Sequence, residues 1–145
     1  MILYLDSSAL VKRYTEEAHS REVREHVRSA GTVGTAEITQ VEVVAAFKKA
    51  VRARTLTAGE ASKARRDLRA DWPSIIRLKI SETVLNRASD LAWQHPLRGY
   101  DAVQLAAAQL WQEAIGEEID LATFDLQLWD VAKTTGLRVW PPDLK

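Results

Sequence analysis

The sequence predicts one α/β domain, covering residues 1–145, with a central and mainly parallel sheet. Short apolar runs alternate with segments of helical periodicity along the chain, a rhythm typical of parallel strands joined by helices. The length of 145 residues fits a single hydrophobic core. The composition, with 46% hydrophobic and 28% charged residues, is that of a globular domain. Such folds carry helices on both faces of the sheet and bind ligands beyond the carboxyl ends of the strands.

Each element expected in the first half of the chain has a local signal. The run Ile2–Leu5 is apolar and ends at Asp6-Ser7-Ser8, which is suited to cap a helix. Gly31 is placed to end a helix, and Thr57 with Glu60 forms a capping box. The predicted elements are, in order, a strand at 2–5, helices at about 8–14 and 20–30, a strand at 32–35, a helix at 38–54 and a helix from 57 to about 72.

The second half of the chain continues the same alternation. Residues 75–80 alternate apolar and polar side chains as a strand does, and Ser81 is suited to cap the helix that follows. Pro96 breaks the chain before an Ala- and Leu-rich helix, and Gly136 stops the last helix. The predicted elements are a strand at 75–80, helices at 81–95 and 100–114, a strand at 119–123, a helix at 126–135 and a strand at 137–140.

Several kinds of protein are excluded by what the sequence lacks. Without cysteine it has no disulfides, no thiolate metal ligands and no cysteine nucleophile, and its histidines, His19, His26 and His95, lack zinc-site spacing. No apolar run approaches the ~18 residues that span a bilayer, and the first residues lack the pattern of a signal peptide. We therefore expect a cytoplasmic protein without a membrane segment, in which any bound metal has oxygen ligands.

Charge is balanced overall but uneven along the chain. Twenty basic and twenty acidic residues give a net charge of zero, so no global positive field would draw the protein to nucleic acid. Residues 48–69, however, contain eight basic groups against two acids, and residues 101–145 contain eight acids against three bases. Solvated helix faces explain this pattern, and a basic rim beside an acidic site would also suit a phosphodiester substrate.

Four acidic residues from distant parts of the chain form the candidate site. Asp6 and Asp125 follow predicted strands, so both belong at the carboxyl ends of the sheet. Glu42 borders the apolar stripe of its helix, and Asp101 begins a helix on the face that points to the core. Each also has a structural interpretation. Asp6 and Asp125 are suited to be helix caps or turn residues, Glu42 to pair with a lysine, and Asp101 to be a helix-start acid favoured by the dipole.

Carboxylates gathered in this way require a positive partner. They would repel one another and raise one another's pKa values, and a divalent cation offsets that repulsion. Oxygen-only ligands favour Mg²⁺, Mn²⁺ or Ca²⁺. Such an ion can turn a bound water into a nucleophile and stabilise charge that develops on a phosphate. The four acids therefore predict a Mg²⁺ or Mn²⁺ site and metal-dependent chemistry.

Four short segments also carry a family resemblance. They are DSSALVKRY at 6–14, TAEITQVEVVAAFKKA at 35–50, LRGYDAVQLAAA at 97–108 and LATFD at 121–125. Together they resemble the motifs of PIN-domain ribonucleases, most closely the VapC toxins of toxin–antitoxin pairs. The resemblance implies a three-layer α/β/α fold, Mg²⁺- or Mn²⁺-dependent endonucleolytic cleavage of RNA, and a cognate antitoxin that blocks the site.

The resemblance also implies roles for single residues. It carries over the acids Asp6, Glu42, Asp101 and Asp125, with the hydroxyl residues Ser8 and Thr123 in support. Because strand and helix ends hold carboxylates rigidly, we expect Asp6 and Asp101 to be the direct or water-mediated ligands. The other two acids would complete the outer coordination, hold a second ion or orient the attacking water.

Two positions depart from the family pattern. Gln104 stands where related sequences often have histidine, and Ala36-Glu37 stands where many have serine. Glu37 is therefore a rival carboxylate for the site. Neither departure removes a predicted metal ligand.

Basic and aromatic residues supply further expectations. Lys12, Arg13 and Arg98 lie near the acids in sequence and are candidate RNA contacts, with ordinary surface charge as the alternative. The five tryptophans share no platform for stacking on bases, so we assign them to the core or an interface. An Ala- and Leu-rich helix that includes Trp111 makes a homodimer an expectation. The tryptophans are Trp72, Trp93, Trp111, Trp129 and Trp140.

Two rival functions remain open at this point. A catalytically silent PIN-like module that binds antitoxin or nucleic acid would keep the fold, although all four acids are present. A receiver domain or a haloacid-dehalogenase-like phosphatase also places acids at strand ends. The receiver domain needs paired acids ahead of its phosphoacceptor strand, and the phosphatase needs DxDx[TV] where this chain has Asp6-Ser7-Ser8-Ala9-Leu10.

Overall fold

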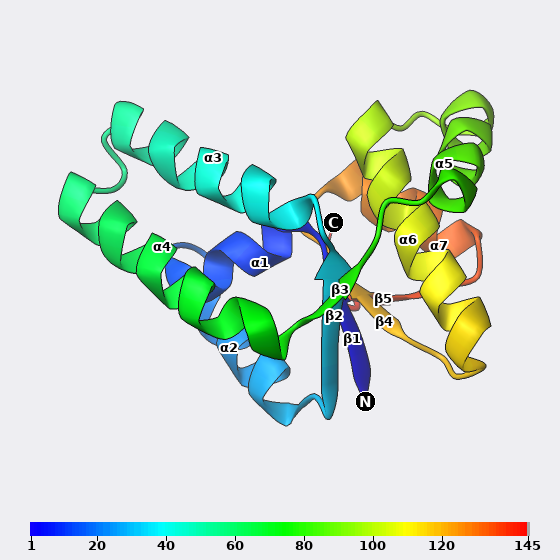
Figure 1. The fold of residues 1–145 in the computed structure, drawn as a ribbon, viewed down its shortest axis with the longest axis horizontal. Coiled ribbons are helices and arrows are strands. Elements are labelled where there is room, and N and C mark those ends of the chain that lie inside the picture. Colours follow the sequence, from blue (N-terminus) through cyan, green and yellow to red (C-terminus); the bar gives the residue numbers. More distant parts are fainter. Residues whose placement is uncertain (145) are drawn as a thin grey trace.

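A five-stranded parallel sheet lies between two layers of helices in the computed structural model, which describes residues 1–144 (Figure 1). The strand order is β3-β2-β1-β4-β5, and each neighbouring pair is parallel. The strands are β1 Ile2–Leu5, β2 Thr32–Ala36, β3 Ile76–Leu78, β4 Asp120–Ala122 and β5 Arg138–Trp140. The predicted α/β/α class with a mainly parallel sheet is confirmed.

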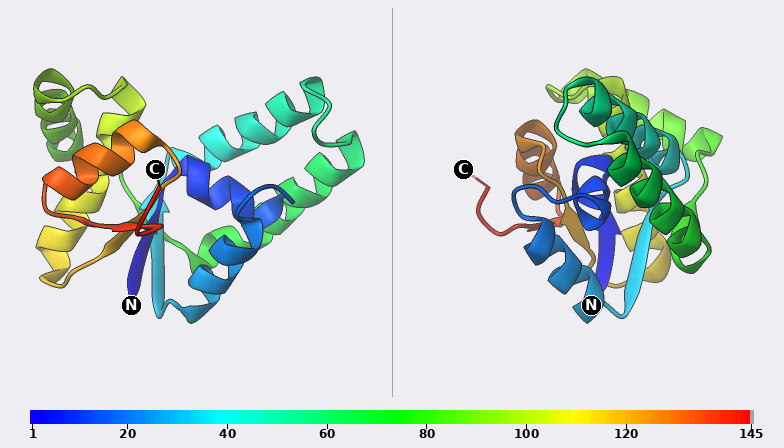
Figure 2. Two further views of the ribbon diagram at one scale, coloured as in Figure 1. Left: turned by 180° about the vertical axis from the view of Figure 1, so that it is seen from behind. Right: turned by 90° about the vertical axis from the view of Figure 1, so that its left-hand side faces the viewer.

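The helices divide between the two faces of the sheet. The first four cover one face and the last three cover the other, as two opposite views show (Figures 1 and 2). The helices are α1 Ser7–Tyr14, α2 Ser20–Ser29, α3 Thr39–Arg52, α4 Ala58–Asp71, the short 3-10 helix η1 Trp72–Ser74, α5 Glu82–Gln94, α6 Gly99–Ile115 and α7 Leu126–Thr134. Helices α3 and α4 form a hairpin that extends away from the sheet (Figure 1).

The central strand β1 contributes side chains to two hydrophobic clusters, one on each face of the sheet. Its side chains alternate, so Leu3 and Leu5 join the cluster that includes Phe47 of α3. Tyr4 points the other way and joins the cluster that includes Leu105 of α6. Because β1 is buried on both faces, its apolar run has no polar interruption.

Local signals position most element ends, with small differences at two places. Asp6 itself caps α1, so the helix begins at Ser7 rather than at the expected Ser8. The capping box of Thr57 and Glu60 is present. The predicted strand at 75–80 is reduced to β3, because this edge strand has a neighbour on one side only.

The tryptophans do not all lie in the core. Trp111 and Trp129 are buried, whereas the side chain of Trp93 is 90% exposed. Of the two predicted places, core or interface, the core is therefore excluded for Trp93, and a position in an interface stays a prediction. Trp111 packs inward against the sheet at Gly34, which removes it as the reason to expect a homodimer.

The topology creates a crevice next to β1. From β1 the chain builds β2 and β3 on one side, and later returns to add β4 on the other side. The carboxyl ends of β1 and β4 therefore flank the point at which the strand order reverses, where α/β proteins bind ligands. In the described part of the chain, no helix has both the length and the apolar character needed to cross a membrane.

Candidate functional site

Asp6 and Asp125 lie at the carboxyl ends of the two strands that flank the crevice. Leu5 pairs with Ala122 across β1 and β4, and the next backbone N–H, that of Asp6, donates to Ala122 at 3.2 Å. Both acids are also N-caps, because their carboxylates accept from backbone N–H groups in the first turns of α1 and α7. The capping interpretation is therefore confirmed for these two positions, and it leaves them in place as candidate site residues.

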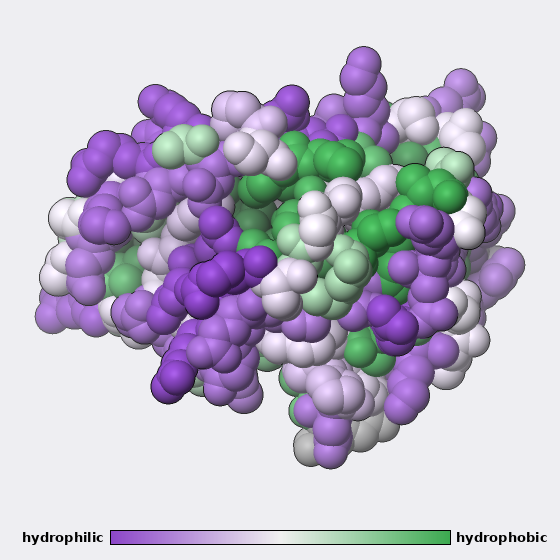
Figure 3. All heavy atoms as spheres, turned by 90° about the horizontal axis from the view of Figure 1, so that it is seen from below, coloured by the Kyte–Doolittle hydropathy of each residue, from purple (hydrophilic) through white to green (hydrophobic). Residues whose placement is uncertain are grey.

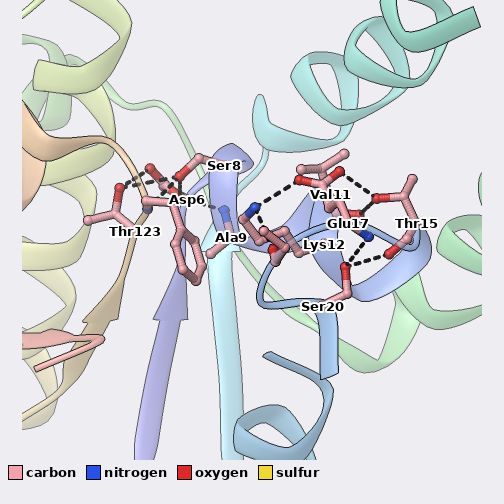
Figure 4. Close-up of polar contacts among 11 residues, drawn as sticks. Asp6, Ser8, Ala9, Val11, Lys12, Thr15, Glu17, Ser20 and Thr123 are labelled. Atoms are coloured by element: carbon pink, nitrogen blue, oxygen red, sulfur yellow. Dashed lines mark hydrogen bonds and ion pairs between the residues drawn. The ribbon is translucent and has the colours of Figure 1, made fainter. Parts of the chain in front are cut away.

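Asp6 is a buried carboxylate with several protein donors. Its side chain is 3% exposed. Oδ1 accepts from the Ala9 backbone N–H at 2.9 Å and from the Ser8 hydroxyl at 2.7 Å, while Oδ2 accepts from the Thr123 hydroxyl at 2.5 Å (Figure 4). Burial raises the pKa of Asp6, these hydrogen bonds lower it, and the charge of Asp101 raises it. The net result is a pKa of about 6. Ser8 and Thr123 thus contact a site carboxylate, as the sequence predicts.

Arg98 joins Asp101 and Asp125. Its Nε donates to Asp101 Oδ2 at 3.0 Å, and its Nη2 donates to Asp125 Oδ2 in a short contact. Asp101 lies in the first turn of α6 and is 4% exposed. Burial raises the pKa of Asp101, the hydrogen bond from Arg98 lowers it, and the charge of Asp125 raises it. The guanidinium therefore supplies positive charge between two carboxylates of the site.

Glu42 completes the group from the first turn of α3. Its carboxylate accepts from the Gln104 amide at 2.8 Å and from the Ser7 hydroxyl at 3.4 Å. Burial raises the pKa of Glu42, these hydrogen bonds lower it, and the charge of Asp101 raises it again. The charge of Asp101 raises the pKa of Asp6 and of Glu42, and Arg98 bonds to both Asp101 and Asp125, so Asp101 links the other three acids.

The donor set fits a hard divalent cation, although its side chains are not arranged around one. Within residues 1–144, no three Asp, Glu or His side chains are positioned to hold a metal ion together. Each carboxylate instead accepts hydrogen bonds from the protein, and Arg98 bridges two of them. The available ligand atoms are all carboxylate oxygens. Burial and mutual repulsion disfavour the charged state of Asp6, Glu42 and Asp101. Oxygen ligands of this kind suit Mg²⁺ or Mn²⁺.

The basic residues named as candidate RNA contacts already have partners within the protein. Lys12 Nζ donates to Glu17 at 2.8 Å and to the Ala18 carbonyl at 2.9 Å, in a network on the α1–α2 turn (Figure 4). Arg13 pairs with Asp71 at 3.1 Å. Arg98 pairs with the two site acids, so each of the three cations has an internal role.

Glu37, the rival carboxylate, is not among the acids joined by the hydrogen bonds described above. It is exposed at the turn between β2 and α3. There it lines an apolar hollow together with Ile38, Val41 and Tyr100.

Sequence reasoning missed the polar layer behind Glu42. Gln104 is 1% exposed and also contacts Thr39 and Tyr4. The sequence carries a signal for this layer, since Gln104 is a polar residue three positions after Asp101 in an otherwise Ala- and Leu-rich helix. A polar side chain on a buried helix face requires partners.

The fold and the site define an α/β protein with an acidic centre at the reversal point of a parallel sheet. The PIN domain model matches residues 3–134. Ribonuclease VapC45 of Mycobacterium tuberculosis (strain CDC 1551 / Oshkosh) is 33% identical over 144 residues, which cover 99% of this chain and 97% of the relative. Ribonuclease VapC46 of Mycobacterium tuberculosis (strain ATCC 25618 / H37Rv) is 33% identical over 141 residues, or 97% of each chain. The chain therefore belongs to the PIN-domain family, as its motifs indicated.

Solved structures share the fold at lower identity. A toxin–antitoxin complex from Klebsiella pneumoniae contains a chain with a TM-score of 0.68 and 20% identity, covering 97% of this chain and 98% of that one. The structure of FitAcB from Neisseria gonorrhoeae gives a TM-score of 0.65 at 18% identity, covering 98% of each chain. Both likenesses support the three-layer architecture described above.

Proposed function

We propose that this PIN-domain protein is a Mg²⁺- or Mn²⁺-dependent endoribonuclease, the toxin of a toxin–antitoxin pair. The observation that carries the proposal is the meeting of Asp6, Glu42, Asp101 and Asp125 from four separate elements at one edge of the sheet. The full-length similarity to proteins named as VapC ribonucleases supports an RNA substrate.

The four acids are the residues that would hold the metal. Asp6 and Asp101 are buried at a strand end and a helix start, so they offer the most rigid carboxylates. Glu42 and Asp125 are less buried and would complete the coordination or orient the attacking water. When bound, a divalent cation would supply a water nucleophile at neutral pH and stabilise the charge that develops on the phosphate.

The surrounding residues hold this arrangement before the substrate binds. Thr123 and Ser8 fix the two oxygens of Asp6, and the first turn of α7 fixes Asp125. In-line attack of water on a phosphodiester would break the bond to the 3′ oxygen and leave a 5′-phosphate and a 3′-hydroxyl. Arg98 would leave the carboxylates as the cation enters, because both positive charges compete for the same oxygens.

Two protein partners belong to the same proposal. A cognate antitoxin would block the acidic edge, and the similarity to chains from toxin–antitoxin complexes supports that partner. A homodimer would cover the exposed apolar side chains of Ile38, Val41 and Tyr100, which are 40%, 62% and 48% exposed around one hollow. Sedimentation velocity would detect the dimer, and a monomer at micromolar concentration would contradict it. We further propose that the protein acts in the cytoplasm, which cell fractionation would test.

The decisive experiment is to map cleavage ends on total RNA after expression of the wild type and of carboxylate variants. Asp6→Asn and Asp101→Asn should each reduce cleavage by a factor of 100 or more, on the order of what loss of electrostatic stabilisation costs elsewhere, while the fold is retained. Asp67→Asn, on the exposed side of α4, is the matched control and should cleave like the wild type. Activity should appear with Mn²⁺ and disappear with EDTA. Full activity in both site variants would contradict the proposal.

A further inference from the structure

Gln104 is a buried amide in which every polar atom has a partner. It lies in α6 with 1% of its side chain exposed. Its Oε1 accepts from the Tyr4 hydroxyl at 2.5 Å, and its Nε2 donates to the Thr39 hydroxyl at 2.9 Å and to Glu42 Oε1 at 2.8 Å. Three elements, β1, α3 and α6, therefore meet at one amide.

The chemistry of the partners fixes which way the amide faces. A carboxylate only accepts hydrogen bonds, so the NH₂ end of Gln104 must face Glu42. The reversed amide would press its oxygen against a carboxylate oxygen. Tyr4 is fully buried, and its hydroxyl donates to the amide oxygen at 2.5 Å from the opposite side. The orientation of Gln104 is thus determined from both sides.

Glu42 depends on this amide for its position. Its other side-chain contact, from Ser7, is long at 3.4 Å, while the contact from Gln104 is 2.8 Å. The Glu42 side chain is long and only half-buried, so without a firm donor it has several rotamers available. We propose that Gln104 is a positioning residue, braced by Tyr4 and Thr39, that holds the Glu42 carboxylate toward the acidic edge. The inference rests on the proposed metal-dependent activity, in which Glu42 is a ligand.

Chemistry also distinguishes acceptable replacements from unacceptable ones. Histidine at position 104 can donate one ring N–H to Glu42 and accept at the other nitrogen from Tyr4. Methionine has a similar length but neither donates to Glu42 nor accepts well from Tyr4. Gln104→His should therefore retain the function of the amide, and Gln104→Met should lose it.

The test compares Mn²⁺ affinity, measured by titration calorimetry, with kcat and KM for RNA. Gln104→Met should weaken Mn²⁺ binding about tenfold or more and lower kcat with little change in KM, as loss of a residue that orients a ligand does. Gln104→His should bind Mn²⁺ within about threefold of the wild type, since the donor is restored. Ser20→Ala is the matched control, because Ser20 is equally buried and its hydroxyl bonds to the backbone of Thr15 and Glu17 in the turn between α1 and α2. It should lower the melting temperature without changing Mn²⁺ affinity.

Two outcomes separate this inference from the proposed function. If the wild type binds Mn²⁺ and cleaves RNA, and folded Gln104→Met does both equally well, the positioning role is overturned and the ribonuclease stands. If the wild type neither binds Mn²⁺ nor cleaves RNA, the proposed function fails and the inference fails with it. If Gln104→Met does not fold, the Tyr4→Phe variant tests the positioning role instead. It removes only the hydroxyl that braces the amide, so weakened Mn²⁺ binding supports the role and wild-type binding overturns it.

Discussion

Asp6 shows how one side chain can satisfy a local and a distant requirement at once. Oδ1 caps α1 by accepting from the Ala9 backbone, and Oδ2 accepts from Thr123 on the far side of the β1–β4 boundary. Asp125 divides its oxygens in the same way, with Oδ1 on the Leu128 backbone and Oδ2 on Arg98. Because a cap holds its carboxylate at a fixed place, the first turns of α1 and α7 preorganise the acidic edge.

The pKa of Asp6 predicts a pH dependence of stability in the metal-free protein. Its folded-state value of about 6 lies above the ordinary value of 3.8. The folded protein therefore holds a proton that the unfolded chain has released, so stability falls as the pH rises from about 4 through about 6. The difference between these two pKa values corresponds to a loss of about 3 kcal/mol in the free energy of unfolding at neutral pH.

Replacing the ionisable Asp6 by a neutral residue should remove this loss of stability at neutral pH. Asparagine keeps an oxygen toward Ala9 and cannot ionise, so with EDTA at pH 7 Asp6→Asn should be more stable than the wild type by up to about 3 kcal/mol. At about pH 4 the difference should disappear. Urea unfolding across this range measures the difference, with Asp67→Asn as a control at a partly exposed carboxylate. A wild type more stable than Asp6→Asn in EDTA at neutral pH would refute the prediction.

Arg98 predicts a competition between an internal cation and the metal. Its guanidinium bonds to Asp101 and Asp125, and a metal ion bound at the proposed site would need the same oxygens. Arg98→Gln should therefore bind Mn²⁺ about fivefold or more tightly than the wild type, a coupling of ordinary size, and its metal-free form should melt at a lower temperature. Calorimetry and melting curves measure both effects. The control is Arg87→Gln, which breaks a comparable ion pair with Glu113 on α5 and α6. Equal Mn²⁺ affinity in Arg98→Gln and the wild type would disprove the competition.

At the scale of elements, the site depends on how closely α6 approaches the sheet. Asp101 and Gln104 both lie on α6, and the Trp111 ring on the same helix covers Gly34 of β2. A Cβ atom at position 34 would lie 2.6 Å from the ring, closer than atoms tolerate. Glycine at this point lets the helix lie near enough to β1 for Gln104 to reach Tyr4.

Adding a methyl group at Gly34 should therefore destabilise the fold. Gly34→Ala should lower the free energy of unfolding by about 1–3 kcal/mol, as overpacking of a core does. Trp111→Phe shortens the facing ring, so the double variant should lose less stability than the sum of the two single variants. Chemical denaturation of the wild type, the two single variants and the double variant measures these free energies. Gly59→Ala in α4 is the control, because a Cβ there would make only an ordinary contact, at 3.9 Å from Thr57 Oγ1, and the change should stabilise by up to about 1 kcal/mol. Additive losses at Gly34 and Trp111 would contradict the packing argument.

At the scale of the whole molecule, charge is segregated between the α3–α4 hairpin and the acidic edge. Hydrophilic residues dominate the side of the surface on which the hairpin lies, while apolar atoms gather near the middle (Figure 3). Arg65 and Arg69 line a groove between α3 and α4 that begins at Gln40 and Val41, next to Glu42 in the chain. If the proposed ribonuclease function is right, these two arginines are candidates to contact the phosphates of the RNA.

This distribution predicts the salt dependence of RNA binding. In an Asp6→Asn background, which preserves the RNA, Arg65→Ala/Arg69→Ala should weaken binding and make the plot of log affinity against log salt shallower by about 1.4, the value for two lost contacts to a single strand. Lys12→Ala/Arg13→Ala is the comparison, and it should change the slope less because both cations are paired within the protein. Filter binding at several salt concentrations measures the slope. An unchanged slope in the Arg65 and Arg69 variant would exclude the groove as an RNA contact.

The sequence by itself determined the order of the elements, several of their caps and which acidic residues are candidates for the site. These follow from signals that act within a few residues, such as the capping box of Thr57 and Glu60 or the apolar run of β1. Only the tertiary structure decided which side chains meet. Thr123 reaches Asp6 across 117 positions and Tyr4 reaches Gln104 across 100. Arg98 bridges two acids although its side chain remains exposed. Such contacts depend on the distance between packed elements, which no local pattern encodes.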